Sequence, residues 1–158
     1  MTKVLFICLG NICRSPAAEG VFQDLVINEN LSDKIFVDSA GTIGNHEGQL
    51  PDARMRKQAL LRGIELKSRS RKFNEHVDFD DFDYIITMDN SNYKNIKELD
   101  INKKYNEKIF KLTSFCKDTD DEEVPDPYWS GEDGFELVLN MVTDGSTNLL
   151  KYIKERLK

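Results

Sequence analysis

The N-terminal part of the sequence contains an apolar run, a short loop and the start of a helix. Residues 3–7, Lys-Val-Leu-Phe-Ile, are apolar after the lysine, as is typical of a parallel strand buried on both faces. Ser15 and Pro16 carry helix-start signals: serine is a favoured N-cap, and proline fits the first helical position, with Glu19 in the first turn. The sequence therefore predicts a buried strand that leads through a loop, residues 8–14, into a helix.

The same alternation of strand-like and helix-like segments continues along the chain. Further strands are predicted over residues 35–39, 83–88 and 109–112, and helices over residues 16–28, 53–61, 90–99 and 133–158. This order predicts an α/β fold, an open four-stranded parallel sheet flanked by helices on both faces, in a single domain of residues 1–158. Gly145 lies inside the last helix, where we expect a kink or a break rather than a functional hinge.

Three polar side chains, those of Cys8, Ser39 and Asp89, lie at or just beyond the ends of predicted strands. In open parallel sheets, ligands bind outside the carboxyl ends of the strands. We therefore expect these side chains on one rim of the sheet. The loop after the first strand also ends at a helix N-terminus, where free backbone N–H groups and the helix dipole favour an anion such as phosphate.

Composition and charge exclude several classes of protein. The net charge of −6 argues against nucleic-acid binding, which usually needs a basic face. No apolar stretch approaches a membrane span and the N-terminus lacks the segments of a signal peptide, so we expect a cytoplasmic protein with no membrane segment. Three cysteines are an odd number for a disulfide framework, and we expect reduced thiols. His46 and His76 lie far apart and near no cysteine pair, so we expect no metal site.

Cys8 is followed six positions later by Arg14. A cysteine thiol has a reference pKa of about 8.5 and attacks only as the thiolate. The amides of residues 9–14, curled around one point at a helix N-terminus, would favour that anion, and Ser15 can donate a hydrogen bond to the sulfur. The planar guanidinium of Arg14 can bind two phosphoryl oxygens, more strongly in the transition state than in the ground state.

The loop supplies the candidate phosphate-binding residues, which are Leu9, Gly10, Asn11, Ile12, Cys13 and Ser15. Gly10 and Asn11 tolerate the positive φ that a loop needs in order to point successive N–H groups inward. The alternative interpretation is that Cys8 is only a small buried apolar residue at a strand end, a common role for free cysteine.

Asp126 lies between two prolines and is followed by Tyr128 and Trp129. The prolines restrict the backbone and would hold the carboxyl in place. That carboxyl could protonate a departing phenolate and then accept a proton from the attacking water. The two aromatic side chains could form the walls of a site for a flat ring. The alternative is a rigid turn with aromatic side chains that pack on the surface.

Four stretches of the sequence together resemble the low-molecular-weight protein tyrosine phosphatases. They are residues 4–16 (VLFICLGNICRSP), 38–41 (DSAG), 88–89 (MD) and 126–128 (DPY). The resemblance covers essentially the whole chain, in order and in length. It implies a four-stranded parallel sheet with a phosphate-binding loop after the first strand, and the activity of a protein-tyrosine-phosphatase or acid phosphatase.

The resemblance also implies the catalytic residues. Cys8 matches the nucleophile that forms a cysteinyl-phosphate intermediate, Arg14 the phosphate-binding arginine and Asp126 the general acid, with no metal or cofactor. The expected substrates are phosphotyrosine-containing proteins and small aryl phosphates, with inorganic phosphate and other oxyanions as inhibitors. We expect a monomer or a weak dimer.

Five further residues match supporting positions of the family. Asn11, Ser15 and Ser39 match a hydrogen-bond network that holds the loop, and Asp89 matches a carboxylate that orients the arginine. Cys13 matches a second loop cysteine that can trap the oxidised nucleophile as a reversible disulfide.

Two positions depart from the family pattern. Relatives often place a histidine in the hydrogen-bond network where this chain has Ser68. The loop of residues 44–48 lacks the aromatic residue that many relatives present to the substrate. The selectivity of the pocket therefore does not follow from the resemblance.

Three alternative functions remain. Thioredoxin-coupled arsenate reductases share the scaffold but need two redox cysteines after the third strand, a region with none here, and Cys116 stands alone. Protein arginine phosphatases share the loop, but their loop resembles Gly-Asn-Thr where this chain has Gly10, Asn11 and Ile12. The bulkier, apolar Ile12 suits an aryl ring better. A phosphotyrosine-binding module without turnover would typically lack the nucleophile or the acid, and both Cys8 and Asp126 are present.

Overall fold

The computed structural model describes residues 1–157 and has a four-stranded sheet at its centre. The strand order is β2-β1-β3-β4, with β1 (Thr2–Cys8) and β3 (Tyr84–Thr87) inside and β2 (Ile35–Gly41) and β4 (Ile109–Lys111) at the edges. All neighbouring strands run parallel. The predicted open parallel sheet is confirmed.

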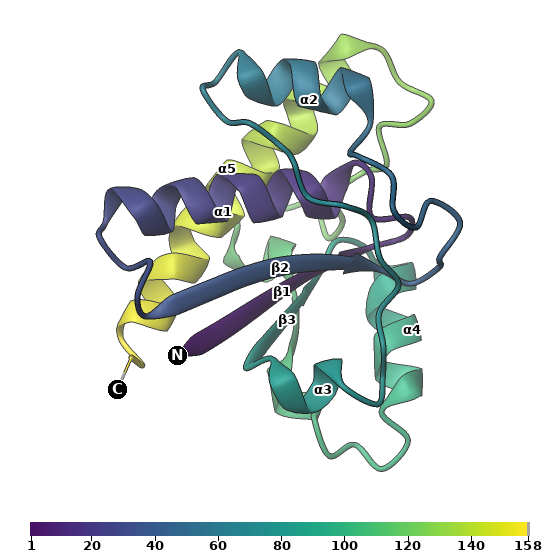
Figure 1. The fold of residues 1–158 in the computed structure, drawn as a ribbon, viewed down its shortest axis with the longest axis vertical. Coiled ribbons are helices and arrows are strands. Elements are labelled where there is room, and N and C mark those ends of the chain that lie inside the picture. Colours follow the sequence, from purple (N-terminus) through teal and green to yellow (C-terminus); the bar gives the residue numbers. More distant parts are fainter. Residues whose placement is uncertain (158) are drawn as a thin grey trace.

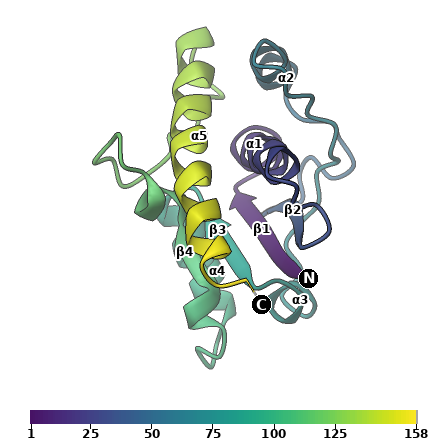
Figure 2. The same cartoon turned by 90° about the vertical axis from the view of Figure 1, so that its left-hand side faces the viewer.

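Helices cover both faces of the sheet (Figures 1 and 2). On one side lie α1 (Arg14–Asn28) and α5 (Glu132–Lys154), with α2 (Ala53–Leu60) outside them, and on the other lie α3 (Asp78–Asp81) and α4 (Asn90–Leu99). Each side has its own apolar core, the larger one beneath α1 and α5. The prediction that helices flank both faces is confirmed.

The apolar run in β1 follows from this two-sided burial. The side chains of Val4 and Phe6 belong to the larger core and those of Leu5 and Ile7 to the smaller one, and all four are fully buried. Successive side chains of a strand point to opposite faces, so a strand covered on both sides needs apolar residues at every position. Each such side chain contributes about 1.5–3 kcal/mol to folding.

Three short helices are additions to the elements that the sequence predicts. They are α3, a 3-10 helix at Asn106–Lys108 and a second 3-10 helix at Leu112–Phe115, which begins where the last strand was expected to end. Each spans four residues or fewer. Segments of this length are too short to show a helical period of apolar residues.

The predicted start of the first helix is wrong by two residues. α1 begins at Arg14, its N-cap is Cys13, and no side chain caps it. Ser15 is not the N-cap because its hydroxyl lies 3.0 Å from the sulfur of Cys8, a contact that local sequence signals do not contain. Pro16 is therefore the third helical residue, and Glu19 lies in the second turn rather than the first.

The last helix is unbroken, contrary to the break or kink expected at Gly145. α5 runs from Glu132 to Lys154, and the expected final residue, Lys158, lies outside the described residues. Gly145 is buried against the second 3-10 helix, where a Cβ atom would lie 2.7 Å from Cγ of Leu112. The glycine therefore permits a close approach between two elements rather than a bend.

Replacing Gly145 by alanine is expected to destabilise the protein by about 1–2 kcal/mol. Overpacking costs roughly 1–3 kcal/mol, and the 2.7 Å approach to Leu112 puts this site in the upper part of that range, roughly 2–3 kcal/mol, of which the better helix propensity of alanine offsets about 1 kcal/mol. The free energy of unfolding in urea measures the effect. Thr143→Ala, at an exposed position of the same helix, is the control and should change it by less. A Gly145→Ala protein as stable as the wild type would contradict this account.

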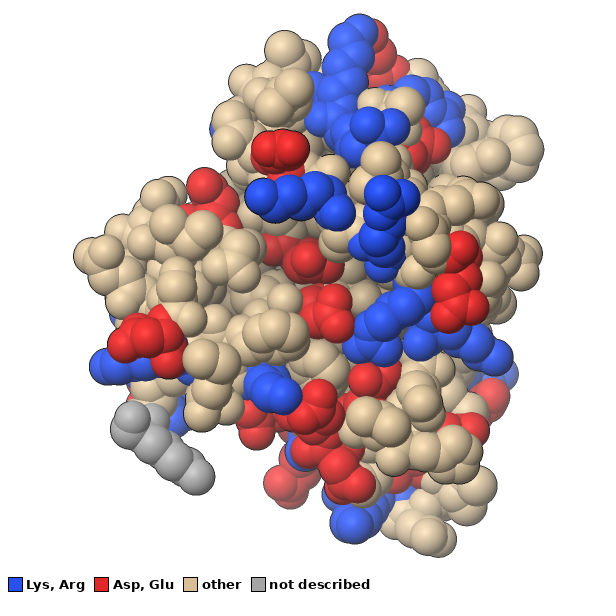
Figure 3. Space-filling model, viewed as in Figure 1, with Lys and Arg blue, Asp and Glu red and all other residues tan. Residues whose placement is uncertain are grey.

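Positive charge is concentrated in one part of this acidic chain. Residues 54–72 contain a single acidic residue, Glu65, and eight basic ones, which are Arg54, Arg56, Lys57, Arg62, Lys67, Arg69, Arg71 and Lys72. Figure 3 shows positive side chains gathered over α2 on one face of the molecule. Among residues 1–157, no helix is long and apolar enough to cross a membrane.

Candidate active site

The loop between β1 and α1 has its carbonyl groups tied to surrounding segments. Four of them accept hydrogen bonds: Cys8 from the N–H of Thr42 (3.0 Å), Leu9 from the N–H of Ile43 (3.1 Å), Gly10 from the hydroxyl of Ser70 (3.0 Å) and Ile12 from the N–H of Asp52 (2.7 Å). None of the N–H groups of residues 9–13 donates to another described residue. With the carbonyls held outside, these donors at a helix N-terminus are free for an anion.

One of the two expected positive-φ residues adopts that conformation. Asn11 has φ of 57°, which turns the chain so that successive N–H groups face one side. Gly10 does not have a positive φ, so that expectation is wrong. Its lack of a side chain serves a close approach instead, because a Cβ atom there would lie 3.1 Å from Cδ2 of His46.

The sulfur of Cys8 lies at one end of a chain of side-chain hydrogen bonds behind the loop. Ser15 Oγ lies 3.0 Å from the sulfur, and the amide of Asn11 donates to both Ser15 Oγ (2.8 Å) and Ser39 Oγ (2.9 Å). We call these four residues the thiol network. Cys8 is 3% exposed, so its sulfur reacts only with a group that enters the loop.

Arg14 is held against the loop by two partners. Its Nη1 atom donates to Asp89 Oδ2 (2.7 Å) and to the carbonyl of Val124 (3.0 Å). Burial opposes the charge, but the neighbouring Cys8, Asp89 and Asp126 side chains outweigh it, and the pKa of Arg14 lies above its usual value. The guanidinium therefore stays charged, and its Nη2 atom faces the general-acid candidate, 3.8 Å from Asp126 Oδ2.

Asp89 is placed by the start of α4. It is the N-cap of that helix, and its Oδ1 atom accepts a hydrogen bond from the N–H of Asn92 (2.7 Å). The other oxygen, Oδ2, is left for Arg14. A local capping motif thus fixes a carboxylate that orients the arginine.

Asp126 lies on the loop before α5 with its carboxyl 44% exposed. Its Oδ1 atom accepts a hydrogen bond from the N–H of Tyr128 (3.0 Å), a turn that fixes the side chain. The other oxygen points toward Arg14. This carboxyl is therefore both positioned and open to solvent.

A cavity of about 240 Å³ joins these groups. It is lined by Cys8, Leu9, Gly10, Ile12, Cys13, Arg14, Ile43, Asn45, His46, Asp126, Tyr128 and Trp129. The rings of Tyr128 and Trp129 meet edge to face with centroids 4.9 Å apart. Arg54 supports this wall, because its guanidinium lies 5.3 Å from the Tyr128 ring and donates to the Tyr128 carbonyl.

The structure brings together the expected site residues. Cys8, Arg14 and Asp126 line one cavity, Asn11, Ser15 and Ser39 form the network behind it, and Asp89 contacts the arginine. Trp129 lines the cavity but is 91% exposed, so it covers the site less than Tyr128 does. The loop of residues 44–48, expected to lack an aromatic group, contributes the imidazole ring of His46.

Several residues that hold the site were not predicted from the sequence: Glu19, Ser70, Arg71 and Asn92. Ser70 binds the loop carbonyl of Gly10, and the N–H of Arg71 donates to Asn11 Oδ1 (3.0 Å). For two of these four residues, the sequence contains a local pattern that could have indicated the role. Asn92 stands three residues after an N-cap aspartate, and Glu19 stands four residues after Ser15, on the same face of α1.

All three cysteines are free thiols. Burial raises the pKa of Cys13 far above its usual range, with further contributions from Asp52, Cys8 and Asp126. Burial likewise raises the pKa of Cys116 to about 12. In the part of the chain described here, no group of three His, Cys, Asp or Glu side chains is arranged to hold a metal ion.

Comparison with known proteins gives a consistent result. A family model described as "Low molecular weight phosphotyrosine protein phosphatase" matches residues 3–158. The low molecular weight protein-tyrosine-phosphatase YfkJ of Bacillus subtilis is 39% identical over 155 residues, 98% of this chain and 97% of that protein.

Solved structures also match. The crystal structure of a protein tyrosine phosphatase from Entamoeba histolytica, with Hepes in the active site, superposes with a TM-score of 0.94 at 46% identity and covers 98% of each chain. A structure named drosophila arginine phosphatase has a TM-score of 0.88 at 34% identity and covers 97% of this chain and 98% of that one.

Proposed function

This chain belongs to the low molecular weight phosphotyrosine protein phosphatase family, and we propose that it hydrolyses phosphotyrosine in proteins through a phosphate bound covalently to Cys8. The observation that carries this proposal is the convergence of Cys8, Arg14 and Asp126 on one cavity at the loop. A nucleophile, a phosphate-binding cation and an acid are the groups that this reaction requires.

In the first step, the thiolate of Cys8 attacks phosphorus in line with the bond to the tyrosine oxygen. The S–P bond forms as the P–O bond breaks, and Asp126 gives its proton to the departing phenolate. In the second step, Asp126 takes a proton from water while the water oxygen attacks phosphorus. The S–P bond breaks, inorganic phosphate is released and Cys8 returns to the thiolate.

The loop stabilises the charge that develops during both steps. The free N–H groups of residues 9–13 and the guanidinium of Arg14 surround the position that three phosphoryl oxygens would occupy. Donors fixed before the reaction cost no reorganisation when the transition state forms. The same donors would bind inorganic phosphate and other oxyanions, which we propose as competitive inhibitors.

The cavity walls support an aryl substrate. Tyr128, Ile12 and His46 offer flat or apolar surfaces around the sulfur, which suits a phenyl ring between phosphate and peptide. The basic segment of residues 54–72 favours an anionic phosphoprotein in spite of the overall negative charge. Oxidation of Cys8 would be reversible through a disulfide with Cys13, as in the family pattern.

Turnover of p-nitrophenyl phosphate without added metal tests the proposal. We expect hydrolysis that persists in the presence of a chelator and is inhibited by vanadate, since Cys8 and Arg14 supply the chemistry. Matched peptides with phosphotyrosine and phosphoserine should differ, because the shorter phosphoserine leaves the phosphate above the sulfur. Hydrolysis that requires a metal, or thiol oxidation that depends on arsenate, would contradict the proposal.

Phosphoarginine is a second candidate substrate, favoured by the structural match to a protein named arginine phosphatase. Ile12 at the cavity wall argues against it, because an apolar side chain gives no hydrogen bond to a guanidinium. The ratio of kcat/KM for phosphotyrosine and phosphoarginine peptides decides between the two. Ile12→Thr should shift that ratio toward phosphoarginine.

A further inference from the structure

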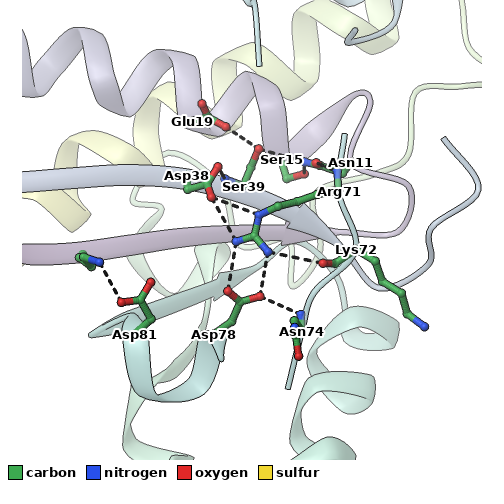
Figure 4. A network of polar contacts seen from close by, with 11 residues as sticks. Asn11, Ser15, Glu19, Asp38, Ser39, Arg71, Lys72, Asn74, Asp78 and Asp81 are labelled. Atoms are coloured by element: carbon green, nitrogen blue, oxygen red, sulfur yellow. Dashed lines mark hydrogen bonds and ion pairs between the residues drawn. The ribbon is translucent and has the colours of Figure 1, made fainter. Parts of the chain in front are cut away.

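The carboxyl of Glu19 contacts the end of the thiol network that lies farthest from the sulfur. Ser39 donates its hydroxyl hydrogen to Glu19 Oε1 at 2.5 Å (Figure 4). Glu19 and Ser15 are one turn apart in α1 and so lie on the same face of the helix. The carboxyl and the catalytic thiol are thus joined through Ser39, Asn11 and Ser15.

The number of hydrogens in this network fixes its direction. Ser39 has one hydroxyl hydrogen, and since it is given to Glu19, Ser39 Oγ accepts from Asn11. The second amide hydrogen of Asn11 goes to Ser15 Oγ. Ser15 therefore has its own hydrogen free, and the acceptor at 3.0 Å is the sulfur of Cys8.

The orientation of the Asn11 amide is fixed from outside the network. The N–H of Arg71 donates to Asn11 Oδ1 (3.0 Å), so both amide hydrogens must point toward the serines. The guanidinium of Arg71 is itself held between Asp38 and Asp78 (Figure 4). With the amide locked, the state of the carboxyl decides which way the Ser39 hydroxyl points.

We propose that Glu19 is a positioning residue: its carboxylate takes the Ser39 hydrogen, so that Ser39 Oγ stays an acceptor that holds the Asn11 amide, and with it Ser15, in place beside the Cys8 sulfur. The proposal rests on the proposed function, for which Cys8 is the nucleophile. When Glu19 carries a proton, the Ser39 hydroxyl is held less strongly and Ser39 Oγ fixes the Asn11 amide less firmly, although Arg71 still sets the direction of that amide. The Cys8 thiolate then loses part of the hydrogen bond that stabilises it.

The surroundings of Glu19 place this change in the neutral pH range. Burial raises the pKa of Glu19 to about 7, the hydroxyls of Ser39 and Ser68 and the charge of Arg71 lower it, and the carboxylate of Asp38 raises it. A cavity of about 240 Å³ on its solvent side is also lined by three charged residues: Asp24, Glu65 and Lys67. Neither histidine touches the network, since His46 binds Gln49 and His76 lies beside Glu75.

Two variants separate the acceptor from its charge. Glu19→Gln keeps a neutral oxygen that can accept from Ser39, as the protonated carboxyl does, whereas Glu19→Leu removes the acceptor. The readout is the rate at which iodoacetamide alkylates Cys8, followed by mass spectrometry of that residue, because only the thiolate reacts. At pH 8, we expect Glu19→Leu to slow alkylation about tenfold and Glu19→Gln to slow it by a smaller factor, because Gln keeps the acceptor and loses only the charge.

Faster alkylation of Cys8 in the variants than in the wild type would overturn the proposal. If Glu19 acted only as a nearby negative charge, both variants would alkylate faster than the wild type. The pH profile gives a second criterion: the Gln variant should match the wild type below pH 7 and alkylate more slowly than the wild type above it. A ratio that is constant across pH 7 would contradict the positioning role.

Coupling and controls complete the test. In Ser39→Ala, the added change Glu19→Leu should have no further effect, since the connection is already broken. Asp24→Asn, on the same helix and hydrogen-bonded to Asn28, should alkylate as the wild type does. Alkylation needs no substrate, so failure of this proposal is distinct from failure to hydrolyse aryl phosphates.

Unfolding in urea shows whether the variants fold and whether the Glu19 carboxylate destabilises the native state. A carboxyl whose pKa is raised from 4.5 to about 7 on folding favours the native state at low pH and loses that contribution as the pH rises through 7. The urea midpoint of Glu19→Gln should therefore exceed that of the wild type at pH 8 and equal it below pH 4.5. Equal midpoints at pH 8 would show that the carboxylate is not buried as described.

Discussion

Replacing Cys8 by serine is expected to lower kcat for aryl phosphates by roughly 10⁴-fold or more, with the fold and oxyanion binding retained. A serine hydroxyl is not ionised near neutral pH, and the loop offers it no base: Ser15 donates toward this position, and Asn11 donates to Ser15. The loop N–H groups and Arg14 are unchanged, so the variant keeps its anion site. Initial rates with p-nitrophenyl phosphate measure the loss.

The matched control is Cys116→Ser. Cys116 lies away from the cavity, within hydrogen-bond distance of the carbonyls of Leu112 and Met141, and its raised pKa keeps it a thiol. Its replacement should leave kcat unchanged. Isothermal titration with a phosphotyrosine peptide should still show binding to Cys8→Ser. Residual turnover above about a hundredth of the wild-type rate would show that another group is the nucleophile.

Local sequence rules were sufficient for the elements with strong patterns. The strand at Thr2–Cys8 was predicted, over residues 3–7, because burial on both faces demands an unbroken apolar run of β-branched and other large side chains. The site loop was predicted because a strand end, a cysteine and a helix start follow one another within a few residues. These features are local in the chain, so the sequence alone contains them.

Features that depend on distant contacts were not predicted. Ser15 looks like an N-cap until its hydroxyl is seen to bind Cys8 on another element. Gly145 looks like a helix breaker until Leu112 is found packed against its α-carbon. In both cases a tertiary contact assigns the residue a role that competes with its local preference.

Glu19 is the most instructive of these residues. A glutamate near a helix start is ordinarily explained by the helix dipole, and sequence reasoning assigned it to the first turn. In the structure its carboxyl is partly buried against Ser39, at a cost that raises its pKa to about 7. Such a cost is typical of a functional site and rare on a helix surface.

Replacing Asp126 by asparagine is expected to lower kcat for phosphotyrosine by roughly 10²–10⁴-fold, because the tyrosine phenolate leaves without a proton. Asparagine keeps the shape of the side chain, and its carbonyl oxygen can still accept from the N–H of Tyr128. The amide cannot donate an acidic proton, so the variant removes the chemistry and keeps the loop. Steady-state kinetics with a phosphotyrosine peptide measure the change.

The dependence on the leaving group distinguishes a general acid from a structural residue. A phenol that is acidic enough to leave as the anion needs little protonation, so the loss should be smaller for p-nitrophenyl phosphate than for phosphotyrosine, whose phenol has a pKa of about 10. A structural defect would slow both substrates alike. Asp120→Asn, at an exposed position of the preceding acidic loop, should leave both rates unchanged. Since Asp126 also lies 3.8 Å from Arg14, an equal loss on both substrates would mean that its carboxylate orients the arginine instead of protonating the phenol.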